Sequence, residues 1–187
     1  MIGHACGHCL SCTSGILAAL ALRPLADELD ADIHVIGTPD EEWHGSKCVM
    51  CEQGIFADYD MAIMVHMYDK NWAMPRLQAL GEFFYEFSGK AAHASAAPWE
   101  GRNALNGVQL MMHAIDMLRQ HVRPGAQFHG IITNGGAAPN VVPEKSMLQL
   151  YIRAQDKEYL EQLIKLVDDC ARGAAIATQT TYKKIPQ

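Results

Sequence analysis

The 187 residues are 49% hydrophobic and 19% charged, a composition that fits a folded protein and excludes a disordered or fibrous chain. The length allows one ordinary domain, or one small domain with part of another. The formal net charge of -6 provides no basic surface for a phosphate backbone, so nucleic acid is not an expected partner.

The sequence shows neither a membrane span nor a disulfide framework. No run approaches the roughly 18 apolar residues of a membrane span, and no charged segment followed by an apolar one opens the chain. The cysteines are too sparse and too clustered to crosslink a secreted fold of this size, so we expect thiols or metal ligands. They are Cys6, Cys9, Cys12, Cys48, Cys51 and Cys170. We therefore expect a cytoplasmic protein that does not bind a membrane.

The first part of the chain predicts helices alternating with strands. Residues 13–29 are apolar at helical spacing and predict a buried helix, which Pro24 kinks or breaks. Residues 31–39 and 59–67 are short β-branched runs with a helix expected at 45–54 between them. This order is typical of an α/β fold with a parallel sheet, whose chemistry gathers at the carboxyl ends of the strands.

The pattern changes near Pro75, and the rest of the chain predicts a ferredoxin-like α+β sandwich. We place the boundary at residues 1–78 and 79–187, with the first segment only part of a larger domain. The expected order is strand, helix, strand, strand, helix, strand. The ranges are 81–88, 101–120, 128–133, 146–153, 156–172 and 176–184.

Polar residues gather at three expected strand-to-loop positions in the first segment. Cys6 and His8 are a ligand pair suited to zinc or a neighbouring transition metal, and His66 follows an apolar run. Glu41 and Glu42 follow a strand end, where alternating side chains would let one face a metal and the other a substrate. Taken singly, the glutamates are solvated loop residues, the histidine a core residue and the cysteine a small buried side chain. Their joint occurrence favours a metal site.

Five motifs in this order resemble the zinc aminoacylase and carboxypeptidase G metallopeptidase family, in its amidohydrolase branch. They are GHACGH, DEE, VHM, GKAAHASAAPWEGRNAL and TNGGAAPNVVPEKSMLQLYIRA. The last two are similar to aminobenzoyl-glutamate utilisation proteins and dipeptidase-like amidohydrolases. The resemblance implies part of a zinc-peptidase-like α/β catalytic domain followed by a lid domain that pairs two copies into a homodimer. It also implies hydrolysis of the amide bond of an N-acyl amino acid, a dipeptide or an aminobenzoyl-glutamate-like substrate.

The resemblance assigns roles around two divalent metal ions, zinc or manganese. Cys6, His8, Glu42 and His66 would be metal ligands, and Glu41 would be the general base that takes a proton from a metal-activated water.

In the lid, the resemblance assigns three substrate-binding residues. His93 matches the family histidine that reaches the partner subunit's site, while Asn140 and Arg153 match residues that bind the substrate carboxylate. A guanidinium suits that task because it forms two parallel hydrogen bonds to a carboxylate. The alternative for Arg153 is a surface arginine on a strand.

The sequence departs from the family in ways that bear on activity. Cys9 stands where the family has Asp or Asn, and Trp43 and His44 replace small residues. The family's last metal ligand is a histidine that follows the lid, whereas this sequence ends at Gln187. We therefore expect a piece of a longer enzyme that is inactive by itself.

Two other interpretations compete with the catalytic one. The pairs Cys9/Cys12 and Cys48/Cys51 have CxxC spacing and could form a structural zinc module, although the gap between the pairs is longer than usual. A catalytically inactive dimerisation or binding protein could also keep the fold. The sequence leaves open the exact substrate, the metal and the roles of these four cysteines.

Overall fold

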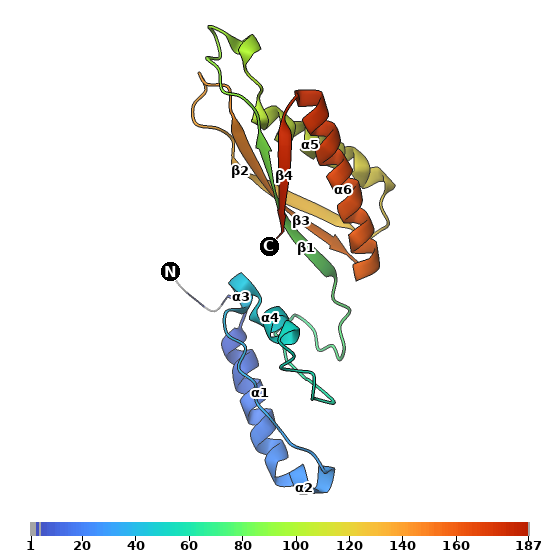
Figure 1. Ribbon diagram of the computed structural model, residues 1–187. Coiled ribbons are helices and arrows are strands. Elements are labelled where there is room, and N and C mark those ends of the chain that lie inside the picture. Colours follow the sequence, from blue (N-terminus) through green and yellow to red (C-terminus); the bar gives the residue numbers. More distant parts are fainter. Residues whose placement is uncertain (1–2, 4, 187) are drawn as a thin grey trace. The chain divides into compact units, whose positions relative to one another are not determined.

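The computed structural model describes residue 3 and residues 5–186, and the chain forms two compact units, Met1–Met74 and Pro75–Gln187 (Figure 1). The second unit contains a four-stranded sheet. The first unit consists of helices joined by extended segments.

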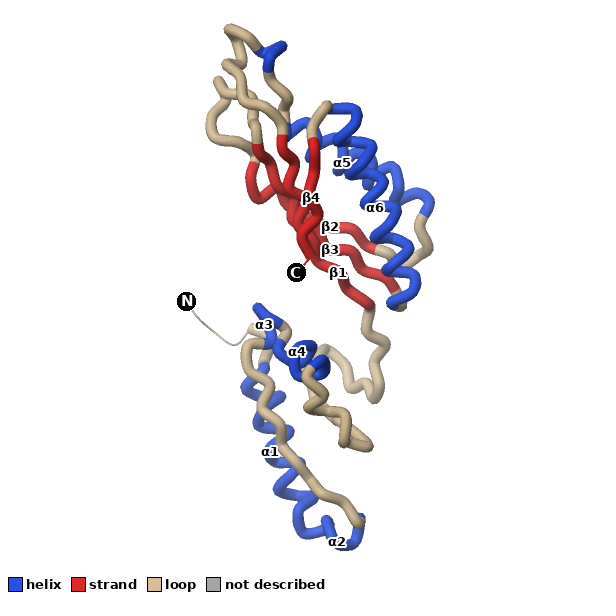
Figure 2. Tube along the Cα trace, viewed as in Figure 1, coloured by secondary structure: helices blue, strands red, loops and turns tan. Residues whose placement is uncertain are grey.

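The second unit is an antiparallel sheet with both long helices on one face (Figures 1 and 2). Its sheet order is β2-β3-β1-β4. In chain order the elements are β1 (Ala79–Ser88), a 3-10 turn (Pro98–Glu100), α5 (Ala104–Leu118), a second 3-10 turn (Arg119–His121), β2 (Gln127–Asn134), β3 (Lys145–Ala154), α6 (Lys157–Thr178) and β4 (Thr181–Pro186). This is the ferredoxin-like split β-α-β arrangement. The predicted lid fold is confirmed.

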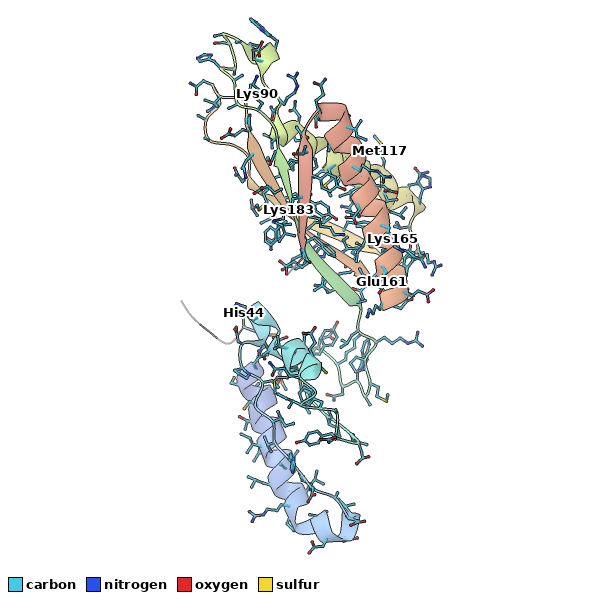
Figure 3. All side chains as sticks on the ribbon, viewed as in Figure 1. His44, Lys90, Met117, Glu161, Lys165 and Lys183 are labelled. Carbon is cyan, nitrogen blue, oxygen red and sulfur yellow. The ribbon has the colours of Figure 1, made fainter. Side chains whose placement is uncertain are left out.

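The core lies between the sheet and the helices because both kinds of element are amphipathic. Tyr85 and Phe87 of β1 alternate with half-buried residues and are fully buried, as are Leu148 and Ile152 of β3. On α6, Leu163 faces the sheet, whereas Glu161 and Lys165 are exposed and point outward in Figure 3. Each buried aliphatic or aromatic side chain contributes about 1.5–3 kcal/mol. The core of this unit is therefore its own.

Side-chain caps fix where the two long helices begin. The Asn103 side chain accepts a hydrogen bond from the Leu105 amide at 2.9 Å, and the Asp156 side chain accepts one from the Tyr159 amide at 2.7 Å. The second helix continues to Thr178, beyond the predicted end at 172, because the intervening residues are rich in alanine. The last strand consequently begins later than predicted.

The first unit contains α1 (His8–Leu22), a 3-10 turn (Arg23–Leu25), α2 (Ala26–Leu29), α3 (Glu41–His44) and α4 (Ser46–Glu52). The break predicted at Pro24 is confirmed, since the 3-10 turn contains it. The prediction that this helix is buried is wrong for the described structure, because α1 has no buried residue.

The two strands predicted at 31–39 and 59–67 are not formed within the described residues of this unit, which contain no β-strand. A strand requires a hydrogen-bonded neighbour, and these extended segments have no ladder partner among those residues. Their apolar side chains are correspondingly exposed, with Ile63 at 81% and Met61 at 73%. The predicted order of helices and extended segments is retained, but the predicted parallel sheet is wrong.

The stretch His8–Leu29 is long and apolar enough to cross a membrane by length and composition, with a mean hydropathy of 1.5. The prediction that no segment has this character is therefore wrong. The same length and composition also occur in the core helix of a soluble protein, so this feature alone is weak evidence for a membrane span.

Candidate functional site

Five polar side chains from three segments converge in the first unit. The Sγ atom of Cys6 lies 3.4 Å from Nε2 of His66. Nε2 of His8 lies 3.5 Å from Oε2 of Glu41 and 3.6 Å from Oε1 of Glu42. The ligand atoms form two groups that share His8, and in each group they lie within 4.8 Å of one another. The structure thus brings together every residue of the first unit that the sequence singled out as a ligand or general base.

Local backbone features allow this approach. Gly7 has φ 71° and precedes α1, and a Cβ at this position would lie 2.9 Å from Cγ of Met67. Glycine therefore lets the segment with Cys6 and His8 pass close to the segment with His66. Nδ1 of His66 lies 2.8 Å from the Met67 carbonyl oxygen, which accepts its proton. In a neutral imidazole this leaves the Nε2 lone pair directed toward Cys6, as a metal ligand requires.

Glu41 and Glu42 are placed differently from the prediction. They occupy the first turn of α3, not a strand end, because Asp40 has φ 56° and the chain turns directly into a helix. Side chains in a helical turn do not alternate between two faces, and both carboxylates approach His8. The expectation that one faces a metal and the other the opposite side is wrong, so the backbone does not divide their roles.

The electrostatics of the cluster favour a cation. Loss of hydration raises the pKa of the Cys6 thiol, and the carboxylates of Glu42 and Glu41 raise it further. A thiolate at this position therefore needs a nearby positive charge. Thiolate, imidazole and carboxylate together are a donor set that suits zinc or a neighbouring divalent transition metal. The residues present fit a metal centre.

The four cysteines of the CxxC pairs do not form a site among the described residues. Cys9 and Cys12 lie on α1, Cys48 and Cys51 lie on α4, and all four are free and exposed. Within the part of the chain that the structure describes, no group of three or more candidate ligands contains any of them. The structural zinc module receives no support.

In the second unit, His93 and Asn140 lie together. The Ala94 amide donates to the Asn140 carbonyl oxygen at 2.9 Å, and His93 forms a β-bridge with Val141. Nδ1 of His93 accepts hydrogen bonds from the Ser95 amide at 3.3 Å and the Ala96 amide at 3.2 Å. The proton of a neutral His93 is therefore on Nε2, where it can be donated to a substrate oxygen.

Arg153 lies at the other end of β3. At about 3.3 Å per residue, the strand from Lys145 to Arg153 spans roughly 26 Å, and Asn140 precedes Lys145. Arg153 is half-buried, and among the described residues its side chain makes no ion pair or hydrogen bond. One copy of this unit does not bring the three predicted substrate-binding residues together.

The sequence did not indicate the residues around Arg153. Glu82 and Tyr151 are directly opposite in the β1–β3 register and lie on the helix-free face of the sheet, which Arg153 shares by alternation. The alternation of residues 146–153 could have predicted Tyr151. Glu82 depends on strand register, which a single sequence does not reveal.

A family model described as the peptidase dimerisation domain of M20 peptidases matches residues 78–178. The chain belongs to the M20 peptidase family. This confirms the resemblance to zinc aminoacylases and carboxypeptidase G, and M20 peptidases are generally metal-dependent. The fold agrees: an aminobenzoyl-glutamate utilization protein from Klebsiella pneumoniae superposes with a TM-score of 0.54 at 23% identity, over 59% of this chain and 28% of that one.

Curated relatives match nearly the whole chain. The Xaa-Arg dipeptidase of Mus musculus is 41% identical over 184 residues, which are 96% of this chain and 43% of the relative. A p-aminobenzoyl-glutamate hydrolase polypeptide of Escherichia coli (strain K12) is 34% identical over 190 residues, covering 97% of this chain and 38% of the relative. The chain thus spans less than half the length of these relatives.

Proposed function

We propose that the full-length protein is a metal-dependent amidohydrolase or peptidase that cleaves an amide bond next to a carboxylate. The observation that carries the proposal is the convergence of Cys6, His8, Glu41, Glu42 and His66, in a chain of a peptidase family. Candidate substrates are N-acyl amino acids, dipeptides and aminobenzoyl-glutamate-like compounds. The names of the similar dipeptidase and hydrolase support this range.

Cys6, His8, Glu42 and His66 would hold two divalent ions, zinc or manganese, and Glu41 would be the general base. When bound, such ions lower the pKa of a shared water toward neutrality. Glu41 is the more buried of the two carboxylates, with 42% of its side chain exposed against 62% for Glu42. A partly desolvated carboxylate that accepts a proton during the reaction fits general-base catalysis.

The second unit would act as a dimerising lid. His93 and Asn140 lie at one end of β3 and Arg153 at the other, so a single lid cannot direct all three at one substrate. A two-fold pair would supply His93 and Asn140 from one copy and Arg153 from the other. The unpaired guanidinium of Arg153 would then bind the substrate carboxylate.

The proposal includes a cytoplasmic location. All six cysteines are free, and a thiolate ligand such as Cys6 survives best in a reducing compartment.

Metal analysis and hydrolysis assays on the full-length protein test the proposal. We expect up to two bound ions per chain, loss of metal in His8→Ala, and retained metal in Cys48→Ala, a control at an exposed thiol outside the cluster. We also expect release of the free amino acid from a dipeptide or aminobenzoyl-glutamate. Metal that survives His8→Ala but not Cys48→Ala would instead indicate a structural site, and absence of both metal and hydrolysis would indicate a non-catalytic protein.

A further inference from the structure

The helix-free face of the sheet carries an ordered group of polar residues around Arg153. Gln149, Tyr151 and Arg153 share this face because they alternate with buried residues along β3. Glu82 of β1 lies directly opposite Tyr151 in the strand register. We call Glu82, Gln149, Tyr151 and Arg153 the open-face cluster.

Within this cluster, the Glu82 carboxylate is held in place but not neutralised. Nε2 of Gln149 donates to Oε1 of Glu82 at 2.7 Å, and the Tyr151 phenol also bonds to the carboxylate. An ionised carboxylate offers about four acceptor sites, so these two donors leave capacity for another ligand. The fixed negative charge also raises the pKa of Tyr151, in addition to the larger effect of lost hydration.

Arg153 places a positive charge beside this negative one. It lies diagonally across the strands from Glu82, a relation that corresponds to about 7–8 Å. Among the described residues the two side chains form no ion pair. A carboxylate and a guanidinium that are close but do not neutralise each other can bind a ligand that carries both charges in the opposite order.

We propose that Glu82 is a specificity-determining residue that binds the cationic side chain of a dipeptide ending in arginine or lysine, while Arg153 binds the α-carboxylate of the same residue. This rests on the proposed function, which supplies the role of Arg153. A carboxy-terminal arginine carries an α-carboxylate and, on a flexible side chain, a guanidinium that pairs with carboxylates. A neutral residue would leave Glu82 without a charged partner. A carboxy-terminal glutamate would be repelled.

The test compares Ala-Arg, Ala-Leu and Ala-Glu as substrates of the metal-loaded full-length protein. We expect the wild type to prefer Ala-Arg. Glu82→Gln keeps the shape and can still bond to Tyr151, but it should lower kcat/KM for Ala-Arg by about tenfold or more, since a hydrogen bond to a charged group is lost. Hydrolysis of Ala-Leu should change less than about twofold, and Ala-Glu should improve.

Glu86→Gln is the matched control, because Glu86 lies on the same strand and face and is paired with Lys145 at 3.1 Å. It should leave the preference unchanged. Equal losses on Ala-Arg and Ala-Leu in Glu82→Gln, or a wild type without preference for Ala-Arg, would overturn this inference and leave amide hydrolysis standing. Failure of the wild type on all three substrates would remove the proposed function, and the role of Glu82 with it.

Discussion

Cys6 and His66 are sixty positions apart in the sequence, yet the Sγ atom of one lies 3.4 Å from Nε2 of the other. The Met67 carbonyl fixes the His66 tautomer, and Gly7 permits the close approach. The pair therefore forms one half of a two-part ligand cluster whose other half is the carboxylate pair of α3. Both halves meet at His8.

Metal should protect Cys6 from alkylation. The neighbouring carboxylates raise the pKa of the free thiol, but the residue is exposed and reacts once a chelator removes the metal. We expect peptide mapping after alkylation to show labelling of Cys6 in the chelated full-length protein and labelling slower by about tenfold or more after metal is restored. Cys51, exposed on α4, is the internal control and should react at the same rate in both states. Equal protection of both, or of neither, would contradict the ligand role of Cys6.

Glu41→Gln and Glu42→Gln should have separable effects. Glutamine at position 41 can occupy the same space without accepting a proton, so metal should remain and turnover should fall by roughly 100- to 10,000-fold. Glutamine at position 42 removes a charged ligand, so metal should be lost. Metal content and turnover should be measured on both full-length variants. Because both carboxylates approach His8, the opposite result is a real alternative, and metal loss in Glu41→Gln alone would exchange the two roles.

The lid could be predicted from the sequence because its signals are local. Alternating apolar residues in β1 and β3 and the helical spacing in α6 determine which faces are buried. The end of α6 was predicted too early because the alanine-rich segment before Thr178 continues the helix, and Gln179, with φ 54°, ends it.

The candidate metal centre could be predicted only as a set of residues. The motifs identified Cys6, His8 and His66, but the conformation of Glu41 and Glu42 depends on the left-handed backbone of Asp40. The predicted parallel strands failed because strand pairing is a long-range property that an apolar run alone cannot establish. The register that places Glu82 beside Tyr151 was hidden for the same reason.

The second unit should form a two-fold dimer through β2. This strand is at the sheet edge, and Ile131 on it is 62% exposed, whereas the opposite edge strand carries Lys183 and Lys184, charges that discourage edge pairing. We expect residues 75–187 to sediment as a dimer at tens of micromolar and Ile131→Lys to sediment as a monomer. Ile176→Lys changes a similarly exposed apolar residue on α6 and should leave the dimer intact. A wild-type monomer would contradict this prediction.

Two glycines in the helices of the second unit should respond to alanine in opposite directions. Gly107 of α5 packs on β1, and a Cβ there would lie 2.4 Å from Cδ1 of Phe87, so Gly107→Ala must displace a fully buried ring. Such overpacking costs about 1–3 kcal/mol. A Cβ on Gly173 of α6 would meet nothing within 4 Å, so Gly173→Ala should gain up to about 1 kcal/mol from helix propensity alone. Urea unfolding of residues 75–187, followed by circular dichroism at fixed protein concentration, measures both changes. Stabilisation by Gly107→Ala would show that α5 and Phe87 are not packed as described, whereas destabilisation by Gly173→Ala would show that this face of α6 is covered in solution, for example by a second copy of the chain.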